Sequence, residues 1–395
     1  MRIVCVGGGP AGLYFAILMR ERGGHEVTVL ERNPAGVTYG WGVVFWDDLL
    51  AELRATNPAT AHAIEAAAFR WSGERLVVDG GEPVDVSGGG YGIARQRLLD
   101  VLHERALSLG VRVEFESEVG DLAQVRGADL VVGCDGVNSR IRRLHGDRFG
   151  TSVSTGRNKY IWLGTTKVFE LFTFAFVDTE AGWIWCHAYG FDDRTSTFIV
   201  ECAPETWAGL GFDRLGEDET LRLLERLFAL QLEGRPLRAN GGASWLNFRT
   251  LTNEVWHVDN AVLIGDAAHT THFTIGSGTK LALEDAITLA AKLHEGELHA
   301  ALEAYVRERK LALRPTQTDA RFSAQWFEQV ARYADLDPDR LFALLHERRS
   351  PLLPHLPPAL YYRLHQATHE IPAFRRLRRW AAPRIKARYG SRRAA

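Results

Sequence analysis

The stretch MRIVCVGGGPAG, residues 1–12, decides the fold of this chain. Residues 1–6 have the apolar composition of a short buried strand, and residues 13–22 have the composition of a helix. Between the two stands a loop of closely spaced glycines. A strand, a tight glycine turn and a helix in this order are typical of the first unit of a doubly wound α/β sheet.

The glycines of this loop follow the spacing G-x-G-x-x-G, and each has a physical role. Gly7 permits a tight turn, Gly9 lets the backbone approach a pyrophosphate, and Gly12 lets the helix pack on the strand. The N-terminus of the helix offers free N–H groups and a positive dipole to phosphates. The loop therefore predicts a dinucleotide site.

An acidic residue stands where the ribose of a dinucleotide is expected. Residues 25–31 predict a second strand, which ends in Glu31, 19 residues after Gly12. A carboxylate there accepts hydrogen bonds from both ribose hydroxyls, which favours a ribose without phosphate. This motif alone leaves FAD and NAD open.

Two later segments repeat the pattern of a buried strand followed by an acid. Residues 128–134 end in Asp135-Gly136, and residues 260–264 end in Gly265-Asp266. A glycine loop and a helix over about residues 279–294 follow the second acid. The carboxyl ends of strands are where doubly wound sheets bind ligands. The alternative for each aspartate is that it caps a helix or a turn.

In this order and spacing, the three segments resemble the class A flavoprotein aromatic hydroxylases over roughly residues 1–320. The resemblance implies an α/β fold with a Rossmann-like FAD-binding domain, an antiparallel substrate sheet and a helical C-terminal region. It implies FAD as cofactor, with NADH or NADPH as a transient reductant. The residues that it assigns to FAD are Gly7, Gly9, Pro10, Ala11, Gly12, Glu31, Arg32, Trp41, Val43, Arg95, Asp135, Gly136, Gly265, Asp266, Gly276, Gly278 and Thr279.

The resemblance also divides the chain. The FAD-binding domain is expected to be discontinuous, because two strand-rich stretches interrupt it. The expected FAD-binding segments are 1–70, 94–150 and 255–320. The substrate sheet is expected in 71–93 and 151–254, and the helical region in 321–395.

One departure from the common family pattern narrows the resemblance. Many relatives carry a Pro-Pro pair after Gly-Asp-Ala-Ala-His, where this chain has residues 270–276, TTHFTIG. Together with residues 39–44, 157–162 and 196–202, this segment looks like the branch that hydroxylates salicylyl-CoA or 2-aminobenzoyl-CoA. That branch also contains the indole-ring hydroxylase of violacein biosynthesis, so the substrate stays open.

The mechanism that the resemblance implies needs few protein groups. NAD(P)H reduces FAD, O2 forms a C4a-hydroperoxide, and its distal oxygen attacks an activated ring carbon. A base that takes the ring proton would raise the rate. His187 and His272 are the candidates, with Tyr160 and Phe273 beside them as substrate-binding residues. For each histidine a structural role is the alternative, and His269 is expected to be structural.

Clusters of basic residues bear on whether the substrate is attached to a carrier. Arg157, Lys159 and the basic residues 375–393 could meet the phosphates of coenzyme A. The alternatives are a solvated surface and an indolic or other substrate without CoA. Two further alternatives are a flavin halogenase and a flavoprotein without catalytic activity.

Composition limits the partners of the chain. Lys and Arg total 47 against 49 Asp and Glu in 395 residues, so no global positive field indicates nucleic acid. Four cysteines fit no zinc site, and we expect no metal. No apolar run is long enough to span a membrane, and the N-terminus does not resemble a signal peptide. We therefore expect a cytoplasmic monomer or homodimer that binds a small aromatic molecule and O2.

Overall fold

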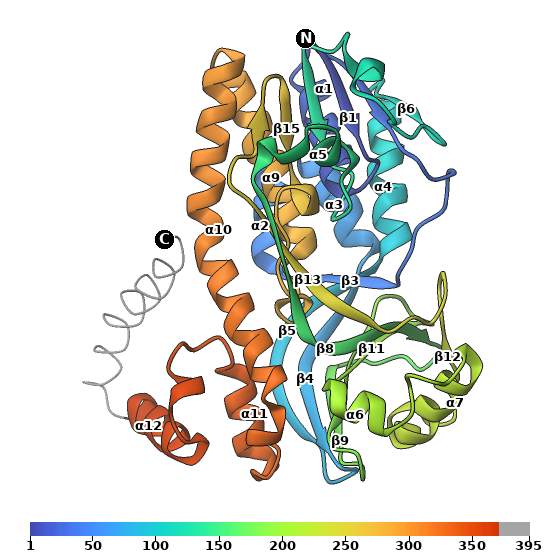
Figure 1. Ribbon diagram of the computed structural model, residues 1–395, viewed down its shortest axis with the longest axis vertical. Coiled ribbons are helices and arrows are strands. Elements are labelled where there is room, and N and C mark those ends of the chain that lie inside the picture. The colour runs from blue at the N-terminus through green and yellow to red at the C-terminus, as the bar shows by residue number, and fades with distance from the viewer. Residues whose placement is uncertain (371–395) are drawn as a thin grey trace.

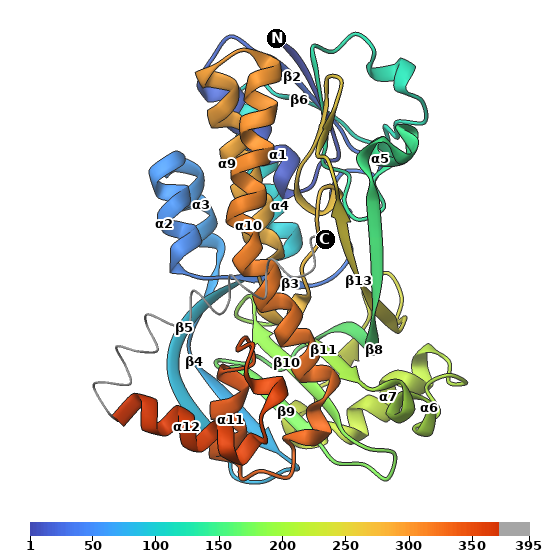
Figure 2. The same cartoon turned by 60° about the vertical axis from the view of Figure 1, so that its left-hand side comes forward.

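The computed structural model describes residues 1–370, which form two β-sheets with helices packed around them (Figure 1). The predicted helical region 321–395 is therefore described only in part, and the basic residues 375–393 lie outside the described residues. One long helix, α10 (Leu298–Glu328), runs alongside both sheets (Figures 1 and 2).

The first sheet carries the glycine loop. Its strand order is β14 (His257–Val258), β15 (Ala261–Leu263), β7 (Leu130–Gly133), β1 (Arg2–Val6), β2 (Glu26–Leu30) and β6 (Arg112–Glu114). All neighbours pair in parallel except β14 and β15. Strands of parallel sheets are buried on both faces, which explains their continuous apolar runs. The predicted strands at 1–6, 25–31, 128–134 and 260–264 thus form neighbouring strands of one sheet.

Helices bury this sheet. Helix α1 (Pro10–Glu21) packs against α4 (Arg95–Ser108) and α9 (Gly278–Glu295), and it is buried from Ala11 to Met19. The sequence predicted α9 to within one residue at each end. Helices α2 (Asp47–Thr56) and α3 (Pro58–Ala67) pack beside this layer (Figure 2), and α5 (Arg140–Leu144) follows β7.

The second sheet contains the strands expected for substrate binding. Its order is β12 (Leu237–Arg238), β8 (Thr151–Thr165), β11 (Ser196–Cys202), β10 (Ile184–Gly190), β9 (Phe172–Val177), β4 (Phe69–Val78), β5 (Val84–Ala94) and β3 (Gly42–Phe45). Strand β13 (Leu246–Asn253) also pairs with β8.

The prediction of a purely antiparallel sheet is wrong at one place, because β4 and β9 pair in parallel. The chain leaves this sheet after β5, builds much of the first sheet, and returns at β8. Strands β4 and β9 are therefore joined by a long crossover, which parallel neighbours require. Strand β3 also joins this sheet, although the sequence placed residues 1–70 with the FAD-binding segments.

Side chains alternate between the two faces of the second sheet. Cys186 and Ala188 face an apolar cluster with α6 (Pro204–Gly209), α7 (Glu217–Leu227) and α8 (Ala229–Leu232). Trp185 faces the other side, where Trp326 and Phe327 of α10 pack. His187 and Tyr189 share the face of Trp185, since they lie two and four residues further along the strand.

The C-terminal helices close that second face. Pro338 and Pro358 stand at the starts of α11 (Pro338–His346) and α12 (Pro358–Glu370), where the missing N–H costs nothing. Helix α10 runs unbroken across the expected boundary at residue 320, with Pro315 inside it. In residues 1–370, none of the helices has both the length and the apolar character needed to cross a membrane.

Candidate functional site

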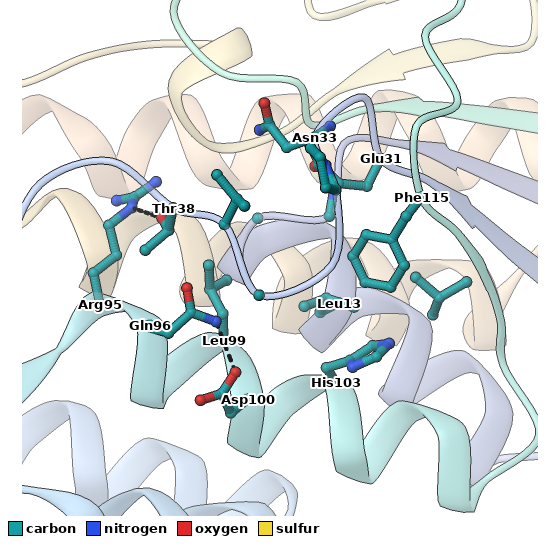
Figure 3. A pocket seen from close by; sticks show the side chains of 16 residues that line it. Leu13, Glu31, Asn33, Thr38, Arg95, Gln96, Leu99, Asp100, His103 and Phe115 are labelled. Carbon is teal, nitrogen blue, oxygen red and sulfur yellow. Dashed lines mark hydrogen bonds between the residues drawn. The ribbon is translucent and has the colours of Figure 1, made fainter. Parts of the chain in front are cut away.

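Two adjoining cavities lie at the carboxyl ends of the parallel strands. The smaller, of about 100 Å³, lies beside α4 and the end of β2 (Figure 3). The larger, of about 700 Å³, lies between the loops of the first sheet and the face of the second sheet that carries His187. Gly9 and Arg95 line both cavities, so the two spaces meet there.

The glycine loop has the geometry that its spacing predicts. Gly7 has a φ of +116°, and a Cβ atom on it would lie 2.5 Å from the carbonyl oxygen of Cys134. A Cβ atom on Gly12 would lie 2.4 Å from the carbonyl oxygen of Gly7. At Gly9 the nearest such protein atom is 4.0 Å away. Neighbouring protein atoms therefore account for Gly7 and Gly12, whereas Gly9 leaves room for a ligand to approach the backbone.

Glu31 lies at the edge of the smaller cavity (Figure 3). Its Oε2 accepts a hydrogen bond from the Gly8 N–H at 2.7 Å, and its Oε1 accepts one from the Asn33 N–H at 2.8 Å. Each oxygen keeps a second lone pair for a hydroxyl. Leu13 and Phe115 add apolar surface to the same cavity. This combination fits an adenosine whose ribose carries no phosphate.

Arg95 is a cation without an acidic partner at the junction of the cavities. Its Nε donates to Thr38 Oγ1 at 3.1 Å (Figure 3), and within residues 1–370 no ion pair joins Arg95 to a carboxylate. Burial lowers its pKa, and the charges of Asp266 and Glu31 oppose that shift. A buried cation is costly unless an anion meets it. The pyrophosphate of a dinucleotide that spans both cavities would supply that anion.

Asp266 faces the larger cavity at the carboxyl end of β15. Its accessible surface is turned to this cavity, and the surrounding protein raises the pKa of the carboxyl, with Arg95 and His269 opposing the shift. The start of α9 lines the same cavity at Gly278 and Thr279. A carboxylate and the free N–H groups of a helix start can together bind polar atoms of a ligand.

A buried ionic network holds the backbone below Asp266. Asp285 is fully buried on α9, and its Oδ2 accepts hydrogen bonds from the Gly265 N–H and from His269 Nε2, both at 2.8 Å. Its Oδ1 accepts from Arg309 Nε at 2.7 Å. His269 therefore has the structural role that the sequence favoured.

Asp135 shows the capping geometry that was the alternative for it. Its Oδ2 accepts hydrogen bonds from the backbone N–H groups of Arg140 and Ile141 at 2.5 and 3.3 Å, at the start of α5. Its Oδ1 is buried without a partner among the described residues. Asp135 does not line either cavity, whereas Gly136 lines the larger one.

His187 lines the larger cavity and is oriented by a buried carboxylate. Its Nε2 lies 3.4 Å from Glu201 Oε2, and Glu201 also accepts from Asn158 at 2.7 Å and from Trp185 at 3.2 Å. A carboxylate can only accept, so the His187 proton lies on Nε2 and the lone pair lies on Nδ1. Burial lowers the pKa of His187, and Glu201 opposes the shift, so the ring is neutral at pH 7.

His272 has a different environment. It does not line either cavity, and burial lowers its pKa to about 4. Its Nδ1 accepts from the Thr274 N–H at 3.4 Å and lies 3.0 Å from Thr274 Oγ1. Thr274 Oγ1 lies 2.8 Å from Ser323 Oγ, which accepts from Arg348 Nε at 3.2 Å. Since arginine only donates, this chain of hydrogen bonds points toward His272 Nδ1 and already uses its lone pair.

The other predicted residues fall into two groups. Tyr160 and Phe273 line the larger cavity with ring centroids 4.9 Å apart. The other predicted cofactor residues on its wall are Pro10, Ala11, Val43, Gly265 and Gly276. Arg32 and Trp41 line neither cavity; Arg32 is exposed, and Trp41 packs against Gly164 and Phe191. The role of each predicted residue in binding or catalysis stays a prediction.

Sequence reasoning missed several residues of the larger cavity and the carboxylate behind it. Glu201 carried a signal, because it is a lone acid in the apolar run of β11. Glu74 and Arg348 carried none, since their elements meet only in the folded chain. The missed aromatic residues of the cavity wall are Trp46, Trp71, Trp162, Phe172, Phe174, Tyr189 and Phe248.

Arg157 and Lys159, which the sequence suggested for CoA phosphates, differ in their surroundings, and the structure adds Arg249, which sequence reasoning did not name. Arg157 pairs with Glu205 at 2.5 Å, so its charge is already used. Lys159 donates to Asn247 at 2.7 Å and lies over the ring of Trp207. Arg249 is exposed at the edge of the larger cavity, where it donates to Asn138 at 2.9 Å. Lys159 and Arg249 therefore have neutral hydrogen-bond partners.

The fold and the site define the class of the protein: it is an α/β protein whose dinucleotide-binding cavity adjoins an aromatic-lined cavity. Comparison with known proteins gives the same class. A family model described as "FAD binding domain" matches residues 1–318. The chain therefore belongs to the FAD-binding family of flavin-dependent aromatic monooxygenases, with FAD as cofactor and NAD(P)H as reductant. This confirms the fold class, the cofactor and the enzyme class that the sequence predicted.

Three relatives show how close the likeness is. The chain is 41% identical to a salicyloyl-CoA 5-hydroxylase of a Streptomyces species over 84% of its own length, and spans 66% of that protein. It is 36% identical to the Streptosporangium sibiricum 3-hydroxy-4-methyl-anthranilyl-(aryl-carrier protein) 5-monooxygenase, covering 86% and 92% of the two chains. It is 33% identical to the Chromobacterium violaceum protodeoxyviolaceinate monooxygenase, covering 93% and 99%.

Solved structures support the fold alone. A tetrameric 2-methyl-3-hydroxypyridine-5-carboxylic acid oxygenase superposes with a TM-score of 0.67 at 19% identity, covering 91% of this chain and 95% of that one. A flavin-dependent halogenase has a TM-score of 0.64 at 19% identity. The fold by itself therefore does not separate hydroxylation from halogenation.

Proposed function

We propose that the protein hydroxylates the ring of an aromatic acyl thioester. The observation that carries this proposal is the aromatic-lined cavity, which holds the oriented His187 on its wall and Arg249 at its exposed edge. A ring fits between the aromatic side chains, and the exposed edge leaves a path for a long acyl carrier.

We further propose which residues hold the cofactor. The adenosine would lie at Glu31, the pyrophosphate at Gly9 and Arg95, and the flavin beside Asp266 and the start of α9. Support comes from the open approach at Gly9 and from the cation at Arg95, which has no acidic partner within the part of the chain that the structure describes. When bound, FAD supplies the reaction with O2 that places one oxygen atom on the ring, while NAD(P)H supplies the electrons that reduce the second oxygen atom to water.

The protein contributes orientation, water exclusion and a proton acceptor. Phe273 and Tyr160 would contact the substrate ring from the cavity wall, and the aromatic wall would keep water away from the reacting atoms. His187 would take the proton of the activating ring substituent at Nδ1, because Glu201 holds the proton of the other nitrogen in place. The resulting imidazolium would face the buried carboxylate that stabilises it.

The acyl carrier is supported by charge and by two relatives. Lys159 donates to Asn247, and Arg249 lies two residues further along the same strand as Asn247 and donates to Asn138. Within residues 1–370 neither cation is paired with a carboxylate, so both charges are available to phosphates. The names of two of the three relatives above contain an aryl group on a carrier, which is CoA in one name and an aryl-carrier protein in the other. A substrate without a carrier is the second candidate, because this chain spans 99% of the protodeoxyviolaceinate monooxygenase.

The experiment compares thioesters with free acids. Purified FAD-bound protein is given salicyloyl-CoA, 2-aminobenzoyl-CoA, the two free acids and an indolic acid, and both NAD(P)H oxidation and hydroxylated product are measured. We expect thioesters to have the highest kcat/KM. We expect Arg249→Gln to raise KM for thioesters more than it lowers kcat, because the proposed role of Arg249 is to bind carrier phosphates and not to take part in the ring chemistry. Equal kcat/KM for thioester and acid, or turnover of indolic acids alone, would exclude the thioester proposal.

A further inference from the structure

One arginine of the larger cavity, Arg348, has no role in the FAD site proposed above. Arg348 follows α11, lines the cavity, and lies with its guanidinium carbon 5.9 Å from the ring centre of Phe174. Residue 348 lies outside the segment 1–318 that the family model matches. Of the other arginines on this wall, Arg95 stands at the junction with the adenosine cavity, and Arg249 is exposed at the edge. The three arginines therefore lie in different parts of the site.

Among residues 1–370, every hydrogen bond of Arg348 goes to a neutral group. Its Nε donates to Ser323 Oγ at 3.2 Å, and its two terminal nitrogens donate to the carbonyl oxygens of Leu345 at 2.8 Å and Thr274 at 3.3 Å. A guanidinium has five N–H groups, so two remain. These three bonds fix the position of the side chain without neutralising its charge.

Glu74 is the acidic residue whose charge acts on Arg348, and it already has another partner. Glu74 lines the same cavity, and its carboxylate lies 3.2 Å from His346 Nε2. No ion pair joins Glu74 to Arg348 in residues 1–370. Burial lowers the pKa of Arg348 to about 10, so the guanidinium stays charged at neutral pH. Keeping such a charge on a largely aromatic wall is costly unless a ligand supplies the anion.

We propose that Arg348 binds an anionic oxygen of the aromatic substrate and thereby selects which rings the enzyme accepts. This inference rests on the proposed function, since it concerns the substrate of the same cavity. In a salicyloyl thioester the acyl carbon is uncharged, and the oxygen that can carry charge is the ring hydroxyl. In a free acid it is the carboxylate. The bound group is an oxyanion in both cases, and a guanidinium can hold it with two parallel hydrogen bonds.

Binding of small ring compounds tests this role without turnover. The FAD-bound protein is titrated with salicylate, benzoate, salicylamide and benzamide, and the change in the flavin absorbance spectrum gives each Kd. Benzoate carries only the carboxylate, salicylamide only the phenol, and benzamide neither. We expect Arg348→Gln to raise the Kd of compounds that carry the bound oxyanion about tenfold or more, and that of benzamide less than about twofold.

Further variants separate recognition from folding. Arg348→Lys keeps the charge but loses the paired hydrogen bonds, so it should give a smaller loss with the same ligand pattern. Ser323→Ala removes one anchor of the guanidinium and should again give a smaller loss. Arg349→Gln is the matched control, because Arg349 is the adjacent arginine and does not line the cavity. FAD content and melting temperature of each variant show whether it is folded.

The compounds identify the source of the oxyanion. A loss with benzoate and salicylate but not salicylamide shows a carboxylate, and a loss with salicylamide and salicylate but not benzoate shows a phenolate. The proposal is wrong if the parent protein binds anionic compounds no more tightly than benzamide, or if Arg348→Gln affects all compounds equally or none. Failure of thioester turnover would leave these ring affinities unchanged, so the two proposals can fail independently.

Discussion

Replacing Asp285 by asparagine tests the network that supports the flavin end of the site. The carboxylate accepts three hydrogen bonds, from Gly265, His269 and Arg309. An asparagine has one acceptor oxygen in nearly the same shape. Whichever way the amide is turned, its NH2 group meets at least one buried donor, and Arg309 loses half of its negative surroundings.

The expected cost follows from burial. Removing one partner of a buried ion pair costs about 3–5 kcal/mol. Arg309 keeps Glu284, which lies 3.0 Å from its terminal nitrogen, so we take the lower end, about 3 kcal/mol. Unfolding entropy of about 2.1 cal/mol/K per residue gives roughly 0.8 kcal/mol/K for a chain of this size. Asp285→Asn should therefore lower the Tm by about 4 °C.

The assay is thermal unfolding of the FAD-free protein followed by tryptophan fluorescence, with the FAD-bound protein in parallel. Glu295→Gln is the matched control on the same helix, because Glu295 pairs with Lys292 at 3.1 Å but is 63% exposed. Such a surface pair is worth under about 1 kcal/mol, or roughly 1 °C here. If Asp285→Asn melts within about 1 °C of the parent protein, or no lower than the control, the network does not carry the stability assigned to it.

Three other perturbations probe the cofactor and the base. Gly12→Ala places a methyl group 2.4 Å from the Gly7 carbonyl oxygen, so the affinity for FAD should fall about 10- to 100-fold, as measured by flavin fluorescence. Gly88→Ala is the control, because its methyl group meets no atom within 4 Å and the affinity should stay unchanged. Glu31→Ala removes the expected ribose acceptor and should raise the Kd for FAD about tenfold, whereas an unchanged Kd would place the ribose elsewhere. In the parent protein, kcat should fall with pH below 6.5 as His187 is protonated, because its pKa is lowered. Glu201→Gln removes the charge that raises this pKa, so the acidic limb should move to lower pH; a limb that stays in place would show that His187 is not the base.

Local patterns were enough to predict the first sheet. The apolar runs around β1, β7 and β15 are strands buried on both faces, and each ends in a glycine or acid that marks its carboxyl end. The parallel pairing of β4 with β9 could not be predicted in the same way. Strands that meet through a long crossover leave no turn signal between them, and alternation along a strand does not reveal its neighbour.

Within the site, the success of prediction depended on distance along the chain. Gly9 and Glu31 belong to one short unit, and both line the adenosine end of the cavities. His187 was a candidate because a histidine stands in an apolar strand, but its orientation depends on Glu201, 14 residues away on the next strand. Arg348 meets Thr274 across 74 residues, and no spacing rule connects them.

Helix α10 restricts how the length of the chain between two of its contacts can change. Arg309 bonds to Asp285 beneath the flavin end, and Ser323 bonds to Thr274 on the loop beside the aromatic cavity, 14 residues later in the same unbroken helix. An α-helix turns by about 100° for each residue. One inserted or deleted residue between them would rotate one contact away from its partner while leaving the other intact. The chain can therefore vary the side chains of this segment, but it can change the length of the segment only in steps close to whole helical turns.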